Sequence, residues 1–139
     1  MNFRQLTEKD ILFMKENSLD TAFYKECPKE DTFCWTLEHE EKVLGIGGIK
    51  MVNNTTAICW FDLSKYAGEH IVVCYRVIKE WIPIVCKEKK IRRLEAYVKA
   101  GFEAGVRTVE HLNFDFEHRK KKYIGDIAAD CYVRFFDEI

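Results

Sequence analysis

The chain has 139 residues, enough for one domain with a sizeable core, so we expect a single domain over residues 1–139. Hydrophobic residues make up 47% of the sequence and charged residues 32%, a balance typical of a soluble globular chain. The formal net charge of -1 excludes a global electrostatic attraction to nucleic acid or to an anionic membrane surface.

The hydropathy pattern argues against a membrane or secretory location. No apolar run reaches the roughly 18 residues that a membrane span needs. The first ten residues, MNFRQLTEKD, lack the apolar core of a signal peptide. We therefore expect a cytoplasmic protein.

The cysteines predict neither disulfides nor a zinc site. The sequence contains no C-x-x-C motif, and its four histidines lie far from the cysteines along the chain. We expect small buried thiols in a reducing compartment, and no bound metal. The six cysteines are Cys27, Cys34, Cys59, Cys74, Cys86 and Cys131.

The N-terminal residues predict a strand followed by helices. Residues 2–5 fit a short strand, and Thr7 is a good helix N-cap with Asp10 at the carboxylate position of a capping box. A second helical piece over residues 19–24 should end before Pro28.

Three consecutive strands are expected next. Residues 31–38 alternate apolar and polar side chains, and residues 43–51 contain three glycines, which mark a bulge or a close backbone approach. Residues 56–63 form the third strand. The short polar turns between them predict an antiparallel meander.

The stretch after this meander bears most directly on function. A polar loop, residues 64–69, separates the third strand from a long helix whose apolar residues recur every three or four positions. A helix that starts after such a loop presents free backbone N–H groups and the positive end of its dipole, which attract phosphate. The sequence therefore predicts an anion site near Gly68.

The second half of the chain predicts two more helix–strand alternations. Pro83 should kink or end the long helix. A strand over 91–98, a helix over 100–112 and strands over 113–120 and 130–136 follow. The order βαα-βββ-α-β-α-ββ predicts an α/β (α+β) fold, a mixed sheet with helices on both sides.

This order resembles the fold of the GCN5-related N-acetyltransferases (GNAT), which are acyl-CoA N-acyltransferases, over essentially the whole chain. Three stretches carry the resemblance: FRQLTEKDI, KVLGIGGIKMVNNTTAICWFDLS and VEHLNFDFEHRKKKYIGDIAADCYVRFF. The resemblance implies an enzyme that transfers an acetyl group from acetyl-CoA to a primary amine of a small molecule or a protein.

The resemblance also implies a set of site residues. The pantetheine of acetyl-CoA would lie beside the end of the third meander strand, and its pyrophosphate at residues 65–70. Asp62 would be the general base, with an N-cap or loop carboxylate as the competing role, and Tyr66, Tyr123 or Tyr132 could be the general acid. The implied cofactor-binding residues are Phe61, Leu63, Lys65, Ala67, Gly68 and His70.

Several positions depart from the family pattern. Phe102 and Val109 stand where the family often has an asparagine and a tyrosine, and neither side chain can donate a proton. Glu69 puts a negative charge at the pyrophosphate position, and Asn113 replaces a glycine. These departures keep an alternative open, a catalytically inactive structural or interaction protein.

A narrower resemblance, to acetyltransferase-like proteins of short-tailed bacteriophages, rests on chain length, the long helix and residues 59–61, Cys-Trp-Phe. It implies a location in the host cytoplasm or the virion, and virion proteins or a second copy as partners. Two basic runs, residues 87–93 and 119–122, are flanked by glutamates, so we expect a solvated face and no nucleic-acid partner.

Overall fold

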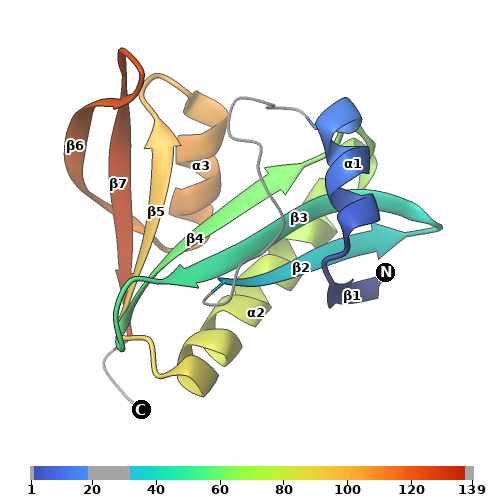
Figure 1. The fold of residues 1–139 in the computed structure, drawn as a ribbon, viewed down its shortest axis with the longest axis horizontal. Helices are drawn as coiled ribbons and strands as arrows, with labels where there is room; N and C mark the ends of the chain where they lie inside the picture. The colour runs from blue at the N-terminus through green and yellow to red at the C-terminus, as the bar shows by residue number, and fades with distance from the viewer. Residues whose placement is uncertain (1, 19–31, 137–139) are drawn as a thin grey trace. The chain divides into compact units, whose positions relative to one another are not determined.

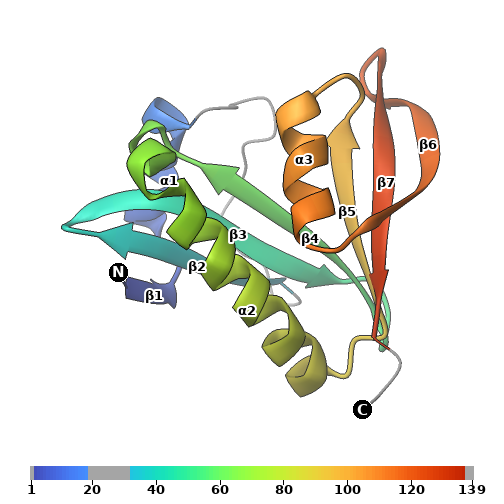
Figure 2. The same cartoon turned by 180° about the vertical axis from the view of Figure 1, so that it is seen from behind.

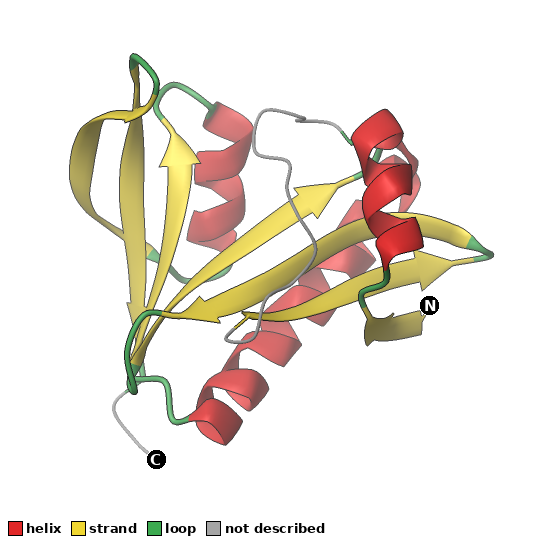
Figure 3. Cartoon of the chain, viewed as in Figure 1, coloured by secondary structure: helices red, strands yellow, loops and turns green. Residues whose placement is uncertain are grey.

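The structure, a computed structural model, describes residues 2–18 and 32–136. The helical piece expected over residues 19–24, and Cys27, lie outside the described residues. Figures 1 and 3 show the helices and strands. These are β1 (Asn2–Gln5), α1 (Glu8–Asn17), β2 (Thr32–His39), β3 (Lys42–Met51), β4 (Thr56–Leu63), the 3-10 helix η2 (Lys65–His70), α2 (Ile71–Lys89), β5 (Arg93–Lys99), α3 (Glu103–His111), β6 (Asp115–Ile124) and β7 (Ile127–Phe135).

The strands form one seven-stranded mixed sheet in the order β1-β2-β3-β4-β5-β7-β6. The predicted α/β class with a mixed sheet is confirmed. The chain divides into two compact units, the first comprising Met1–Lys50 and Cys59–Arg76, the second Met51–Ile58 and Val77–Ile139. No helix in the described ranges is long and apolar enough to cross a membrane.

In the first unit, β1 pairs antiparallel with β2, and β2 pairs antiparallel with β3, which is the first pairing of the predicted meander (Figure 1). The glycines of β3 permit close backbone approaches. A Cβ atom at Gly47 would lie 2.8 Å from the carbonyl oxygen of Trp60, and one at Gly48 would lie 2.7 Å from that of Phe33. Only glycine fits such distances, so the expectation of a close approach in this strand is confirmed.

A buried carboxylate, Asp10, joins α1 to the sheet of the first unit. Arg4 donates two hydrogen bonds to it, at 2.8 and 2.9 Å, and the Thr36 hydroxyl donates another at 2.8 Å. The Thr7 backbone N–H donates at 2.9 Å, which is the Asp10 half of the predicted capping box. Burial by itself would raise the pKa of Asp10, but these hydrogen bonds outweigh it and lower the pKa to about 2.

We predict that Asp10→Asn lowers the free energy of unfolding by about 2 kcal/mol at neutral pH, because the folded state holds Asp10 ionised far below its ordinary pKa of 3.8. The depressed pKa makes this stabilisation complete above about pH 4 and lost as the pH falls through about 2. Urea unfolding across that pH range should show wild type and variant converging in acid. The exposed Glu16→Gln is the control, and a constant difference at all pH values would contradict the assignment.

The second unit is built around β5, β7 and β6, which pair antiparallel. Alternate residues of β5 are buried, namely Leu94, Ala96 and Val98, as the alternation predicted. Helix α3 packs against β5 (Figure 2). Leu112 and Phe114, which follow α3, are also buried in this core.

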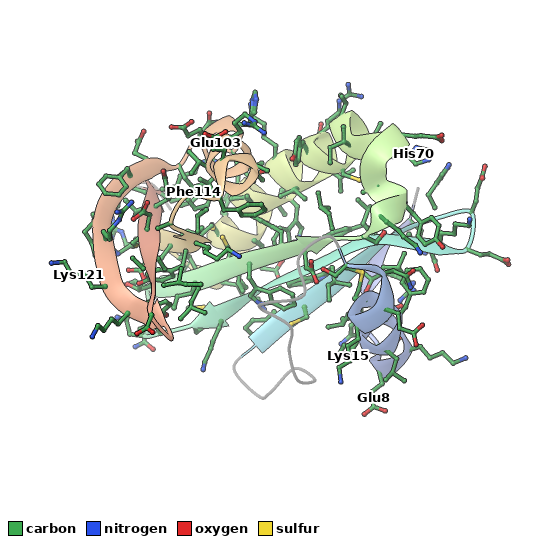
Figure 4. All side chains as sticks on the ribbon, turned by 90° about the horizontal axis from the view of Figure 1, so that it is seen from above. Glu8, Lys15, His70, Glu103, Phe114 and Lys121 are labelled. Carbon is green, nitrogen blue, oxygen red and sulfur yellow. The ribbon has the colours of Figure 1, made fainter. Side chains whose placement is uncertain are left out.

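Strand β6 lies at the edge of the sheet and is irregular. Its pairing with β7 shifts register between Phe116 and His118 and again between Lys120 and Ile124. Lys122 has a positive φ of 51°, unusual for a lysine. Lys121 projects away from this edge in Figure 4.

Helix α2 does not end at Pro83, which was one of the two outcomes expected there, but continues to Lys89, with Val85 and Cys86 buried. Pro83 has no N–H to donate to the backbone carbonyl group four residues earlier in the helix. Because Pro83 is exposed, water can hydrogen-bond to that carbonyl group instead. The last two strands are longer than predicted and meet at a tight turn, where Gly125 has a φ of 60°.

Asn113 adopts the left-handed conformation, with a φ of 69°, as expected for a residue in a glycine position. We predict that Asn113→Ala lowers the free energy of unfolding by about 1 kcal/mol, because a Cβ-bearing residue other than asparagine is strained there. Asn113→Gly should leave it nearly unchanged. Thermal unfolding of the two variants checks this, and equal destabilisation by both would contradict it.

Candidate functional site

The candidate site lies in the first unit, where β4 ends and η2 begins. Ser64 is fully buried and fixes this junction. Its backbone N–H donates to the carbonyl of Leu44 at 2.8 Å, and its hydroxyl donates to the carbonyl of Val43 at 2.6 Å. Both bonds tie the end of β4 to β3.

Ser64 also begins the helix. Its hydroxyl oxygen accepts the backbone N–H of Tyr66 at 3.2 Å, and its carbonyl accepts that of Ala67 at 3.0 Å. The predicted loop over residues 64–69 is therefore wrong: residues 65–70 form a 3-10 helix capped by Ser64. Later N–H groups in such a helix bond to carbonyls three residues back. Two of the main-chain donors in this segment, those of Tyr66 and Ala67, are therefore used by the protein itself.

A hollow of about 380 Å³ opens beside η2 and the turn between β2 and β3. Four residues predicted for the site line it: Lys65, Tyr66, Gly68 and His70. His70 lies where η2 meets α2 (Figure 4). The hollow is also lined by His39, Glu40, Lys42, Leu44 and Glu69.

Cationic and aromatic groups dominate the contacts inside this hollow. The Lys42 ammonium lies 4.5 Å from the centre of the Tyr66 ring, and that of Lys65 lies 5.4 Å from it. The rings of His39 and His70 meet edge to face, with their centres 4.7 Å apart. The two lysines offset Glu40 and Glu69, so protonated imidazoles would make the hollow net positive.

The sequence analysis missed His39, Glu40 and Lys42, although it identified their segment as a polar turn. In an antiparallel meander the start of β3 and the end of β4 lie at the same end of the sheet. That rule brings the β2–β3 turn to η2, and it was available from the predicted strand order alone.

The remaining predicted residues lie on β4 or inside the protein. Phe61, Asp62 and Leu63 are half-buried at the end of β4. The Ser18 hydroxyl donates to Oδ1 of Asp62 at 2.5 Å. Because Ser64 is the N-cap, the competing role of Asp62 as a cap is excluded. The side chain of Ala67 is fully buried.

The second unit holds the other candidate acids. Tyr132 is buried against Phe116, and burial raises the pKa of its phenol. Tyr123 is half-exposed and stacks on Tyr97, with ring centres 5.0 Å apart. Tyr97, which the sequence analysis did not consider, has its pKa raised by burial and donates to Glu95 at 3.1 Å.

Phe102 and Val109, which the resemblance put at two family positions on the predicted helix over 100–112, differ in their placement. Phe102 is the residue that precedes the first turn of α3, and Val109 is buried in the core. Neither position supplies a proton donor. Five cysteines in the described ranges are buried, as predicted.

Comparison with known proteins identifies the fold. No protein-family profile and no curated protein sequence matches the chain. Among solved structures, ribosomal-protein-S18-alanine N-acetyltransferase from Escherichia coli superposes with a TM-score of 0.78 at 14% identity, covering 99% of this chain and 95% of that one. A mutant spermidine N-acetyltransferase from Vibrio cholerae superposes with a TM-score of 0.75 at 10% identity, covering 97% and 95%. The chain has the fold of the GNAT acetyltransferases.

We predict that Ser64→Ala lowers the free energy of unfolding by about 2 kcal/mol, because it removes a buried cap that also bonds to β3. Urea unfolding measures the change. Thr108→Ala removes an exposed hydroxyl that bonds within α3, and should cost less than about 0.5 kcal/mol. Equal effects of the two substitutions would show that Ser64 does not anchor the junction.

Proposed function

We propose that this chain is a GNAT-type N-acetyltransferase that transfers the acetyl group of acetyl-CoA to a primary amine. The observation that best supports it is the shared fold, over 97% or more of the chain, with two N-acetyltransferases. The names of those two enzymes specify an alanine of a ribosomal protein and spermidine. The acceptor proposed here is accordingly an amine of a small molecule or a protein.

The hollow beside η2 suits the phosphate end of acetyl-CoA through its side chains. Gly68 leaves open space, since a Cβ placed there would meet nothing within 4 Å. Lys42 and Lys65 supply two cations, and His70 can supply a third when protonated. Because Ser64 uses the N–H groups of Tyr66 and Ala67, we propose that lysine side chains hold the phosphates more than the main chain does.

The proposed chemistry centres on Asp62, near the end of β4. Acetyl-CoA supplies the thioester. Asp62 takes the proton that the amine loses as the C–N bond forms, and Ser18 holds its carboxylate in place. Water gives a proton to the sulfur as the C–S bond breaks. Tyr66 does not suit this role, because its ring contacts the two lysines proposed for the phosphates and the pantetheine arm separates the phosphates from the sulfur. Phe61 and Leu63 offer apolar surface to the pantetheine arm.

The alternative, an inactive protein with an inherited fold, draws on Phe102 and Val109, neither of which can donate a proton. The use of two main-chain donors by Ser64 also favours it. The virion and bacteriophage interpretations gain no support from the structures compared above.

We predict that acetyl-CoA binds and that Lys65→Ala weakens its binding about tenfold, since one lost charge contact to phosphate corresponds to roughly 1.4 kcal/mol. Isothermal titration calorimetry measures both. Lys79→Ala, which removes an exposed lysine of α2 outside the hollow, is the matched control and should change nothing.

Two outcomes would overturn parts of this proposal. Absence of heat and of a thermal shift at millimolar acetyl-CoA would reject the enzyme and favour the inactive alternative. If acetyl-CoA binds tightly and Lys65→Ala leaves its affinity unchanged, the proposed activity is retained but the proposed phosphate site beside η2 is rejected.

A further inference from the structure

The face of β5, β7 and β6 opposite α3 carries a cluster of chemically reactive side chains. Leu94, Ala96 and Val98 alternate along β5 and are buried, and Val98 lies beneath α3, where its Cγ1 would be 2.8 Å from a Cβ at Gly105. The residues between them therefore point to the other face. Tyr97 is one of these, and its partner across the sheet on β7 is Cys131.

Strand pairing brings a histidine to the same cysteine. His118 of β6 is paired directly with Cys131 of β7, and directly opposed residues point to the same face of a sheet. Thirteen positions separate the two along the chain, so their spacing does not match a zinc-ligand motif.

A β-bulge adds a carboxylate to this pair. The register shift between Phe116 and His118 leaves Glu117 as an extra residue in β6. Its Oε1 atom lies 3.2 Å from Nδ1 of His118 instead of turning to the opposite face. The ligand atoms of Glu117, His118 and Cys131 all lie within 4.8 Å of one another.

We propose that Glu117, His118 and Cys131 form a binding site for a divalent transition-metal ion of the zinc class. A thiolate, an imidazole and a carboxylate are the three ligand types that zinc takes in proteins. Small side-chain shifts would bring these atoms to tetrahedral spacing, with water as the fourth ligand. The thiol proton leaves to solvent as the sulfur binds the ion. Cys131 is fully buried, and the partly exposed Glu117 and His118 form the entry.

Arg93 is the natural competitor of the ion. Its guanidinium donates to both carboxylate oxygens of Glu117, one bond measuring 2.8 Å, and to Glu95 at 2.7 Å. An ion that takes one oxygen of Glu117 therefore displaces part of this pairing, while Glu95 still neutralises Arg93. Removal of Arg93 should tighten metal binding, whereas removal of a ligand should weaken it.

The test is a titration of the reduced full-length chain with Co²⁺, followed by its absorption spectrum. Cobalt bound to thiolate gives a near-ultraviolet charge-transfer band, so the spectrum reports the Cys131 bond directly. We expect this band in the wild type and its loss in Cys131→Ser. His118→Ala should weaken Co²⁺ binding more than about 100-fold. Loss of a residue that only hydrogen-bonds to a metal ligand costs roughly 10–100-fold, so a larger effect indicates a direct ligand. Zn²⁺ should displace the cobalt.

Matched variants keep the proposal falsifiable. His111→Ala and Cys34→Ser change a histidine and a buried cysteine outside the cluster and should leave the band intact. Arg93→Leu should tighten Co²⁺ binding several-fold. Absence of the band at millimolar Co²⁺, or a band that survives both Cys131→Ser and His118→Ala, would overturn the site. Circular dichroism of each variant confirms that it is folded.

Discussion

The change from strand to helix in the first unit depends on one buried hydroxyl group, that of Ser64. It donates to β3 and accepts the N–H of Tyr66 in η2, so a single side chain fixes both the end of a strand and the start of a helix. Because the residue has no exposure to solvent, water does not compete for these bonds. The side chains that line the neighbouring hollow all project from segments held by this junction or by the β2–β3 turn.

Much of the fold was predictable because its signals are local. The alternation of β5, the Asp10 cap and the positive φ of Asn113 each depend on residues within a few positions of one another. The helix that passes Pro83 was not predictable in this way. A proline removes one hydrogen bond, and whether the helix continues depends on burial of Val85 and Cys86, which tertiary packing decides.

The site was less predictable because it depends on pairing between distant segments. The sequence predicted a site at residues 65–70, but not their 3-10 conformation, which follows from bonds between Ser64 and β3. Likewise, the sequence shows that Asp10 caps a helix but not that Arg4 and Thr36 also bind it. Strand register determines which residues of distant segments come into contact, and the register depends on more than one segment of the sequence.

Strand β6 has a consequence for assembly. A sheet edge with unpaired main-chain groups can pair with a strand of another molecule. The edge strand β6 is irregular, because its pairing has two register shifts and Lys122 adopts the left-handed backbone conformation. Two copies aligned there would also press three consecutive positive charges, Lys120 to Lys122, against their counterparts. Strand-to-strand joining along this border is thus discouraged by geometry and by repulsion alike, and any dimer would have to form elsewhere.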